Sequence, residues 1–172
     1  MQGPVSLTRL NQLSRDRFIE TLGSIYEHSP WVADLVYESL PFDSLEELAQ
    51  CMFEAVRQSP ESQRLQLIRN HPELAGKEAS TGSLTTESRR EQSGAGLDQC
   101  SPDELVQLRA LNQRYREKFN FPFVIAVTGL NRAAIIAALE KRLNNSVQVE
   151  LASSISEIGK IASIRLNALI KT

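Results

Sequence analysis

Three polar side chains stand at helical spacing in the second half of the chain. Ser88, Glu91 and Gln92 occupy positions i, i+3 and i+4, so a helix would project a hydroxyl, a carboxylate and a carboxamide from one face. Residues 86–93 are all polar, and a helix without an apolar stripe is either poorly packed or held by polar contacts. The pattern is compatible with the solvated face of a surface helix, or with side chains that converge on one small polar ligand.

A histidine precedes this segment by one loop. His71 is followed by Pro72, which disfavours helical geometry at the residue before it and therefore places the imidazole at a helix exit. Imidazole is the side chain best suited to move protons near neutral pH, although a histidine at a helix end more often caps carbonyl groups. The other histidine, His28, precedes Ser29 and Pro30 in an ordinary turn without a polar cluster, and we interpret it as structural.

A further candidate is an arginine on the last predicted helix. Arg165 lies about 40 degrees from the centre of the apolar stripe of that helix, at roughly 100 degrees per residue. A buried guanidinium needs an anionic partner, because an unpaired buried charge is prohibitively costly. We expect either a structural carboxylate or a carboxylate of a substrate, and Glu91 is one candidate. The stripe consists of Leu151, Ile155, Ile158, Ala162, Leu166 and Leu169.

Other kinds of site lack their signatures. The two histidines and the two cysteines, Cys51 and Cys100, show none of the spacings of metal ligands. No glycine-rich phosphate loop and no G-x-S-x-G turn occurs in the sequence. We interpret both cysteines as small apolar side chains. The sequence therefore predicts no metal site.

Helices are the elements that must position these residues. Cap and proline signals, together with apolar spacings of three and four, predict about eight helices in one domain over 1–172, an all-α class. Residues 73–85 are rich in Gly, Ser and Thr, which is typical of a loop. Residues 121–127 are rich in β-branched and aromatic side chains, so we expect one short extended segment without a partner strand. The helices are expected near 14–28, 31–39, 44–58, 60–70, 86–94, 101–119, 131–144 and 146–170.

Composition argues against several classes of partner. The 172 residues carry a formal net charge of -2 with both signs interspersed, which gives no basic field for nucleic acid or an anionic membrane. No apolar run approaches the roughly 18 residues that span a bilayer. The cysteine usage and the lack of a signal peptide pattern predict a cytoplasmic location.

Four motifs give the chain a family resemblance. They are HPELAGK at 71–77, LTTESRREQSGAGLD at 84–98, Y-x-x-K-F-N-F-P-F-V-I-A-V at 115–127 and I-x-x-I-R-L at 161–166. In this order they resemble the 2-oxo-4-hydroxy-4-carboxy-5-ureidoimidazoline (OHCU) decarboxylases, the last enzymes of the route from urate to allantoin. The resemblance implies an all-helical, cofactor-independent and typically homodimeric enzyme that converts OHCU to (S)-allantoin.

The resemblance also implies roles for individual residues. His71 matches the catalytic histidine of the family, usually assigned as proton donor, and Arg165 matches an arginine that lines the pocket. The substrate-binding segments of the family are matched by Pro72, Ser88, Arg89, Arg90, Glu91, Gln92, Phe123, Val124, Ile125, Ala126 and Val127.

The chemistry of that substrate agrees with this set of side chains. The carboxylate and a hydroxyl share one ring carbon beside an imine, so electrons released with carbon dioxide flow into the ring and no cofactor is required. We hypothesise that His71 transfers the protons, while Glu91, as a second catalytic residue, orients it or binds the ring and ureido nitrogens. Gln92 and Ser88 would fix the ureido and carbonyl groups. The alternatives are a helical module that binds a ureide or purine without turnover, and a protein-interaction scaffold.

Overall fold

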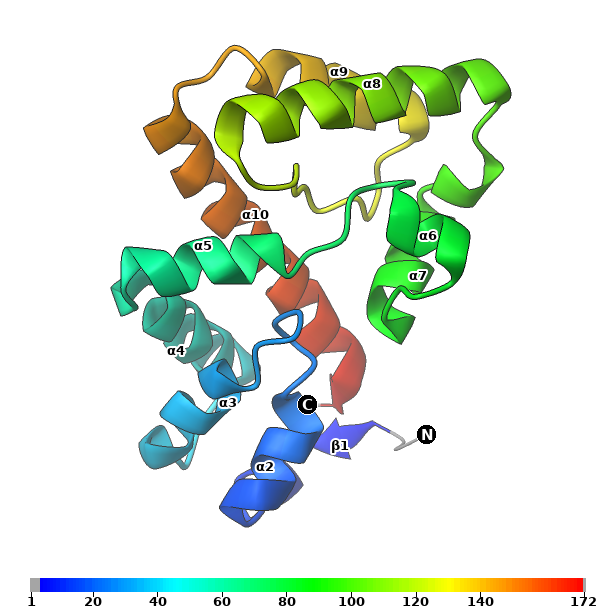
Figure 1. The fold of residues 1–172 in the computed structure, drawn as a ribbon. Coiled ribbons are helices and arrows are strands. Elements are labelled where there is room, and N and C mark those ends of the chain that lie inside the picture. Colours follow the sequence, from blue (N-terminus) through cyan, green and yellow to red (C-terminus); the bar gives the residue numbers. More distant parts are fainter. Residues whose placement is uncertain (1–3, 172) are drawn as a thin grey trace. The chain divides into compact units, whose positions relative to one another are not determined.

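Residues 4–171 are described by the computed structural model, and most of them lie in helices (Figure 1). In chain order the elements are β1 (Val5–Ser6), α1 (Leu7–Leu10), α2 (Arg15–Leu22), α3 (Trp31–Val36), the 3-10 helix η1 (Tyr37–Ser39), α4 (Leu45–Gln58), α5 (Glu61–Arg69), α6 (Lys77–Thr81), α7 (Thr86–Gly94), the 3-10 helix η2 (Leu97–Gln99), α8 (Pro102–Phe119), α9 (Arg132–Arg142), α10 (Val147–Leu169) and β2 (Ile170–Lys171).

The predicted all-α class is confirmed for the described part of the chain. Helices α2 to α5 and α7 to α10 are the eight that the sequence predicts, and the additional α1 and α6 are only four and five residues long. The Ser101 hydroxyl accepts the N–H of Glu104, whose carboxylate accepts the N–H of Ser101, which completes a capping box at the start of α8. The Ser44 hydroxyl caps α4 by accepting the N–H of Glu47. The Glu47 carboxylate accepts the N–H of Asp43 rather than that of Ser44, so this cap is not a capping box. Side-chain caps also stand at the starts of α1, α7 and α9.

Helix α2 ends earlier than the predicted limit near His28. It stops at its eighth residue, and turns follow in which His28 adopts a positive φ of 48°. The carbonyl groups of Ser24 and Ile25, which a longer helix would bond internally, accept hydrogen bonds from Arg165 instead. A contact from the far end of the sequence therefore replaces a helical turn that the apolar spacing favours.

Two very short strands pair the first and last described segments. β1 and β2 are parallel, with Val5 opposite Ile170 and Ser6 opposite Lys171. The sequence does not predict this pairing, because the leading residues lack a period and the last helical pattern continues to Ile170. Residues 121–127 form neither helix nor strand, so the expected interruption of the helical pattern is present.

Contacts within the chain cluster into two compact units. One consists of residues 1–70 and 159–172, and the other of residues 71–158, so the continuous helix α10 contributes to both. A single domain over 1–172 stays a prediction. In the first unit α3 packs against α2 and α4. The buried residues of this unit include Phe18, Val32, Leu48, Met52, Val56 and Leu166.

The second unit has an aromatic core. The Tyr115 ring centroid lies 5.3 Å from that of Phe123 and 6.0 Å from that of Phe121, and both pairs are edge-on. Helices α8 and α9 lie side by side in this unit (Figure 1). The aromatic side chains of α8 and of the Phe-rich segment after it therefore pack in one cluster.

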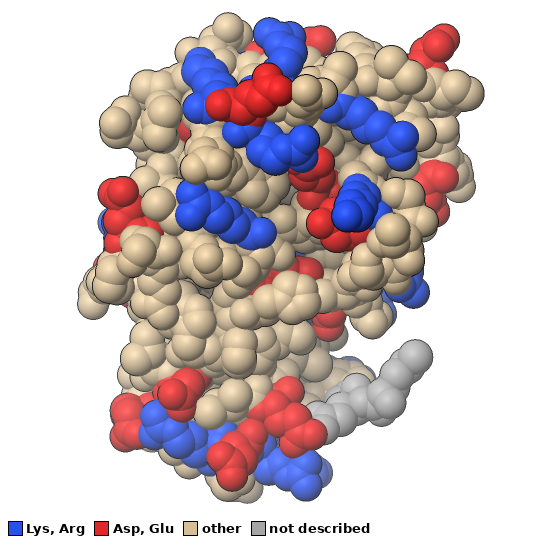
Figure 2. Space-filling view, in the orientation of Figure 1, with Lys and Arg blue, Asp and Glu red and all other residues tan. Residues whose placement is uncertain are grey.

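Charged side chains of both signs lie among one another on the face shown in Figure 2. Among the helices of residues 4–171, none combines the length and the hydropathy needed to cross a membrane.

Candidate active site

The candidate histidine stands at the entrance of a tight turn that follows α5. We call residues 71–76 the histidine turn. His71 is only 7% exposed, the N–H of Gly76 donates to the carbonyl of Glu73 at 3.3 Å, and Ala75 has a positive φ of 51°. A Cβ at Gly76 would lie 2.7 Å from the Cβ of Glu73, so a glycine is needed at this close approach. The imidazole is thus held at a helix exit, as the sequence predicts.

Two buried carboxamides hold the backbone of the histidine turn. Gln92 on α7 accepts at Oε1 from the N–H of Ala75 (3.0 Å) and donates from Nε2 to the carbonyl of Glu73 (3.4 Å). Asn112 on α8 donates from Nδ2 to the carbonyl of Leu74 at 3.0 Å. The sequence places Gln92 on the candidate ligand face of α7 but gives Asn112 no role, since a single Asn on an amphipathic helix carries no distinguishing signal.

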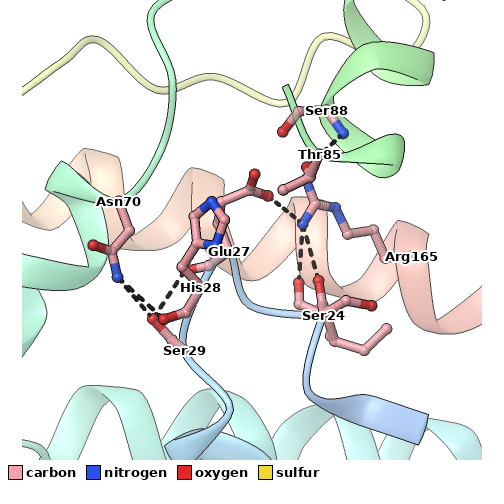
Figure 3. Close-up of polar contacts among 9 residues, drawn as sticks. Ser24, Glu27, His28, Ser29, Asn70, Thr85, Ser88 and Arg165 are labelled. Carbon is pink, nitrogen blue, oxygen red and sulfur yellow. Dashed lines mark hydrogen bonds and ion pairs between the residues drawn. The ribbon is translucent and has the colours of Figure 1, made fainter. Parts of the chain in front are cut away.

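The polar face of α7 is partly buried. Thr85 caps the helix by accepting the N–H of Ser88 at 3.2 Å (Figure 3). Ser88 and Gln92 are buried and Glu91 is half-buried. This face is therefore not the solvated face of a surface helix, and its hydroxyl and carboxamide lie in the protein interior.

Arg89 and Arg90 lie on the other side of α7. Both side chains are exposed, and the Arg89 guanidinium donates from Nη2 to the carbonyl of Gly82 at 3.0 Å. Their guanidinium groups are not brought together with the buried face of the helix. The substrate-binding role that the resemblance implies for them stays a prediction.

Residues 123–127 of the extended segment are held by side chains from two helices. Arg142 on α9 donates from Nη1 to the carbonyl of Val124 at 2.6 Å. Glu157 on α10 accepts at Oε2 from the N–H of Ala126 at 2.9 Å. Backbone groups in an irregular segment need partners when they are buried. Protein side chains supply two of these partners, and the sequence identifies neither of them.

A buried ion pair supports Arg142. Glu150 is fully buried and accepts from Arg142 Nε at 2.6 Å, from Asn145 Nδ2 at 3.0 Å and from the Tyr115 hydroxyl. The guanidinium carbon of Arg142 also lies 4.5 Å from the ring centroid of Phe123, a cation–π geometry. Burial raises the pKa of Tyr115, and its hydrogen bond to the Glu150 carboxylate raises that pKa further. The Phe123 side chain thus belongs to the core, which leaves its backbone for any ligand contact.

Arg165 forms a buried ion pair within the first unit (Figure 3). Its Nη1 donates to Glu27 Oε2 at 2.7 Å, and also to the carbonyls of Ser24 at 3.2 Å and Ile25 at 3.5 Å. The anionic partner that the sequence requires therefore includes a structural carboxylate. The sequence does not identify Glu27 as this partner. The residues after α2 fit a helical pattern, and that pattern does not indicate a buried carboxylate.

The turn that carries Glu27 is fixed by further hydrogen bonds. The Ser29 hydroxyl donates to the carbonyl of Glu27 at 2.9 Å. Asn70, the cap residue of α5, donates from Nδ2 to the Ser29 hydroxyl at 3.2 Å and to the carbonyl of His28 at 3.4 Å (Figure 3). The position of the Glu27 carboxylate is consequently set by the end of α5 as well as by Arg165.

The predicted site residues are divided between the two units. His71, Pro72, the α7 residues and the extended segment belong to the second unit, and Arg165 belongs to the first. Among the described residues, no group of three or more His, Cys, Asp or Glu side chains is arranged to hold a metal ion.

Comparison with known sequences gives one consistent family. The family model described as OHCU decarboxylase matches residues 11–167. A Haloferax volcanii protein named 2-oxo-4-hydroxy-4-carboxy-5-ureidoimidazoline decarboxylase is 40% identical over 162 residues, which cover 94% of each chain. A Mus musculus protein of the same name is 36% identical over 166 residues, 96% of this chain and 93% of the relative.

Solved structures agree with the sequence comparison. A crystal structure of (S)-allantoin synthase superposes with a TM-score of 0.79 at 27% identity; the match covers 98% of this chain and 55% of that longer chain. A crystal structure of OHCU decarboxylase in the presence of (S)-allantoin superposes with a TM-score of 0.69 at 25% identity, over 90% of this chain and 96% of that one.

Proposed function

The chain belongs to the OHCU decarboxylase family, and from this premise we propose that it decarboxylates OHCU to (S)-allantoin without a cofactor. The observation that carries the proposal is the family match over residues 11–167, which includes the histidine turn, α7 and the extended segment. A carboxy-lyase of this kind has to orient its substrate, accept one proton and donate another.

The substrate supplies its own electron sink. When carbon dioxide leaves, the electron pair of the broken C–C bond forms a C=C bond between the two ring carbons, the π electrons of the C=N bond move to the ring nitrogen, and that nitrogen takes up a proton to give an enamine-enol. The protein then takes the hydroxyl proton and delivers a proton to one face of the ureido-bearing carbon. These two proton transfers are the steps that need a side chain.

His71 is the residue to which we assign the proton transfers. Its side chain is largely buried, and Gln92 on α7 holds the backbone of the histidine turn that it begins. A group held in one orientation delivers a proton to one face of a planar carbon, which accounts for a single enantiomer of the product. Pro72, the next residue, belongs to the same turn and is assigned to the substrate pocket.

Glu91 and Ser88 extend from α7 and are assigned to the substrate. The Glu91 carboxylate orients His71 or accepts hydrogen bonds from the ring and ureido nitrogens. The buried Ser88 hydroxyl fixes a carbonyl or ureido group, together with Gln92. Arg89 and Arg90 stay in the proposed site on the resemblance alone.

The backbone of the extended segment is assigned to the polar edge of the ring. Phe123, Val124, Ile125, Ala126 and Val127 provide peptide groups in an irregular stretch, where a ligand can complete the hydrogen bonding. The carbonyl of Val124, the N–H of Ala126 and the carbonyl of Val127, which accepts the N–H of Leu130, already have protein partners. Other peptide groups of the segment are the ones proposed to bind the ring.

Arg165 is assigned to the pocket as a candidate partner of the substrate carboxylate. A carboxylate clamp must not stabilise the ground-state charge too strongly, because that charge is lost in the reaction. The Glu27 carboxylate already balances the Arg165 charge, which fits this requirement.

The decisive experiment measures turnover directly. OHCU is generated in situ from urate, and the appearance of the circular dichroism signal of allantoin is followed with and without the purified protein. Acceleration with formation of (S)-allantoin supports the proposal. Binding of a ureide without acceleration would instead identify a binding module, and racemic product would refute enzyme-directed protonation.

We also propose that the enzyme is a cytoplasmic homodimer, as the family resemblance implies. Size-exclusion chromatography with light scattering tests the oligomeric state: a dimer has about twice the chain mass of 19.2 kDa. A mass of one chain at micromolar concentration would contradict the dimer.

A further inference from the structure

The histidine turn has three consecutive residues whose backbone is bonded by two side chains from neighbouring helices. Gln92 spans the carbonyl of Glu73 and the N–H of Ala75, and Asn112 reaches the carbonyl of Leu74 between them. Both carboxamides are at least 95% buried, since they are 5% and 3% exposed. The chain two to four residues after His71 is therefore held from α7 and from α8 at once.

Carboxamides are suited to this contact for a chemical reason. A primary amide carries N–H donors and a carbonyl acceptor in one plane, so it can pair with both polar groups of a peptide backbone. Gln92 uses one donor and one acceptor in this way. A carboxylate at either position would place an acceptor against a carbonyl acceptor, and an apolar side chain would leave the turn without a partner.

Asn112 is not an optimal choice for stability alone. Its Oδ1 atom is buried and has no hydrogen-bond partner among the residues that the structure describes. A buried acceptor without a partner is destabilising, so an apolar side chain of similar volume at this position would remove one unfavourable group. The same replacement would leave the carbonyl of Leu74 without the hydrogen bond from Asn112. These two effects oppose each other. The remaining contribution of Asn112 is geometric, because its Nδ2 sets the course of the turn.

We propose that Asn112 and Gln92 are positioning residues that orient the His71 imidazole by fixing the histidine turn. This inference rests on the proposed function, because it takes His71 as the group that transfers the proton. Asn112 acts on the reaction through the backbone and touches no substrate atom. Gln92 uses only one of its two amide protons in the turn, so the substrate contact that the resemblance implies is compatible with positioning.

A displaced proton donor has a defined kinetic signature. Misplacement of a reacting group by an ångström lowers the rate by up to about 100-fold, while groups that bind the ground state are unaffected. Loss of positioning therefore lowers kcat and leaves KM in place. It also lowers the enantiomeric excess of allantoin, because protonation is no longer confined to one face.

The experiment compares Asn112→Leu with Gln113→Leu as a matched control. Gln113 is the next residue on α8, and its exposed carboxamide donates to the Glu117 carboxylate at 2.9 Å. For Asn112→Leu we expect kcat to fall about tenfold or more, with KM within about twofold and a melting temperature close to that of the native chain. Gln113→Leu should match the native chain in all three. Enantiomeric excess is measured at an enzyme concentration at which the uncatalysed reaction is negligible.

A second readout does not depend on turnover. The chain has two histidines, so the imidazole NMR signals are assigned with the single variant His28→Gln. Asn112→Leu should shift the signals of His71 and leave those of His28 in place. If Asn112→Leu fails to fold, Asn112→Asp removes the same N–H donor without a change of volume and takes its place in both measurements.

The outcomes separate this inference from the proposed function. Native kcat, native enantiomeric excess and unshifted His71 signals in a folded Asn112 variant overturn the positioning role. A rise in KM at unchanged kcat also overturns it, because that result marks a binding contact. Failure of the proposed function is recognised earlier, as absence of turnover in the native chain.

Discussion

Arg165 and Glu27 form an ion pair whose two side chains are only 5% and 1% exposed, with 2.7 Å between Nη1 and Oε2. The two residues lie 138 positions apart in the sequence and tie the last helix to the turn after α2. Removal of one partner from such a pair takes away a counter-charge of a buried ionised group, which is strongly destabilising.

Replacement of Glu27 by Gln should therefore destabilise the protein. We expect a loss of about 3–5 kcal/mol in the free energy of unfolding, measured by urea titration. The control is Glu20→Gln, which breaks an exposed pair with Arg17 and should cost less than about 1 kcal/mol. Equal losses in the two variants would show that burial of the Arg165 pair has no energetic consequence.

Replacement of His71 by Gln tests the assigned proton carrier. We expect kcat to fall by roughly two to four decades while the affinity for allantoin changes little, because the variant keeps a polar side chain but not a titratable one. His28→Gln serves as control and should retain native turnover. Near-native turnover of the His71 variant would remove this residue from the mechanism.

Replacement of Glu157 by Ala tests the extended segment. The N–H of Ala126 loses its carboxylate acceptor, so residues proposed to bind the substrate through their backbone lose part of their order. We expect KM to rise about three- to tenfold with kcat changed less. The neighbouring exposed residue gives the control Ser156→Ala, which should be silent. An unchanged KM in the Glu157 variant would separate this contact from substrate binding.

Replacement of Gly76 by Ala tests the geometry of the histidine turn. The new Cβ would lie 2.7 Å from the Cβ of Glu73 and 3.1 Å from its carbonyl oxygen, so the turn has to shift. We expect a loss of about 1–3 kcal/mol in unfolding free energy, together with reduced kcat. Gly94→Ala is the matched control, because a Cβ there meets no atom within 4 Å and changes stability by no more than about 1 kcal/mol. Full activity of the Gly76 variant would argue against a requirement for the tight turn.

The raised pKa of Tyr115 predicts a loss of stability at alkaline pH. Burial is the larger cause, and the Glu150 carboxylate adds to it. The unfolded chain releases the phenol proton above pH about 10 while the folded chain keeps it, so stability is fully present below that pH and falls as pH rises further. Urea titrations from pH 8 to pH 11 should show a smaller alkaline slope for Tyr115→Phe than for the native chain. Equal slopes would contradict retention of the proton by Tyr115.

The sequence by itself determined the helical class, the eight longer helices and the polar face of α7. These features depend on neighbours within one or two helical turns, such as the Ser101 and Glu104 capping box. The four motifs were also sufficient to indicate the family, because the residues that identify it are read directly from the chain.

Only the tertiary structure decided which partner each polar group takes. Glu27 on Arg165, Asn112 on Leu74 and Glu157 on Ala126 join residues 138, 38 and 31 positions apart. Helical periodicity assigns a residue to a face but not to a partner, because it repeats within a few residues and carries no information about chain segments that meet after folding. For the same reason α2 ends at Leu22 although its apolar pattern continues, and Arg165 binds the carbonyls of Ser24 and Ile25 in the turn that follows.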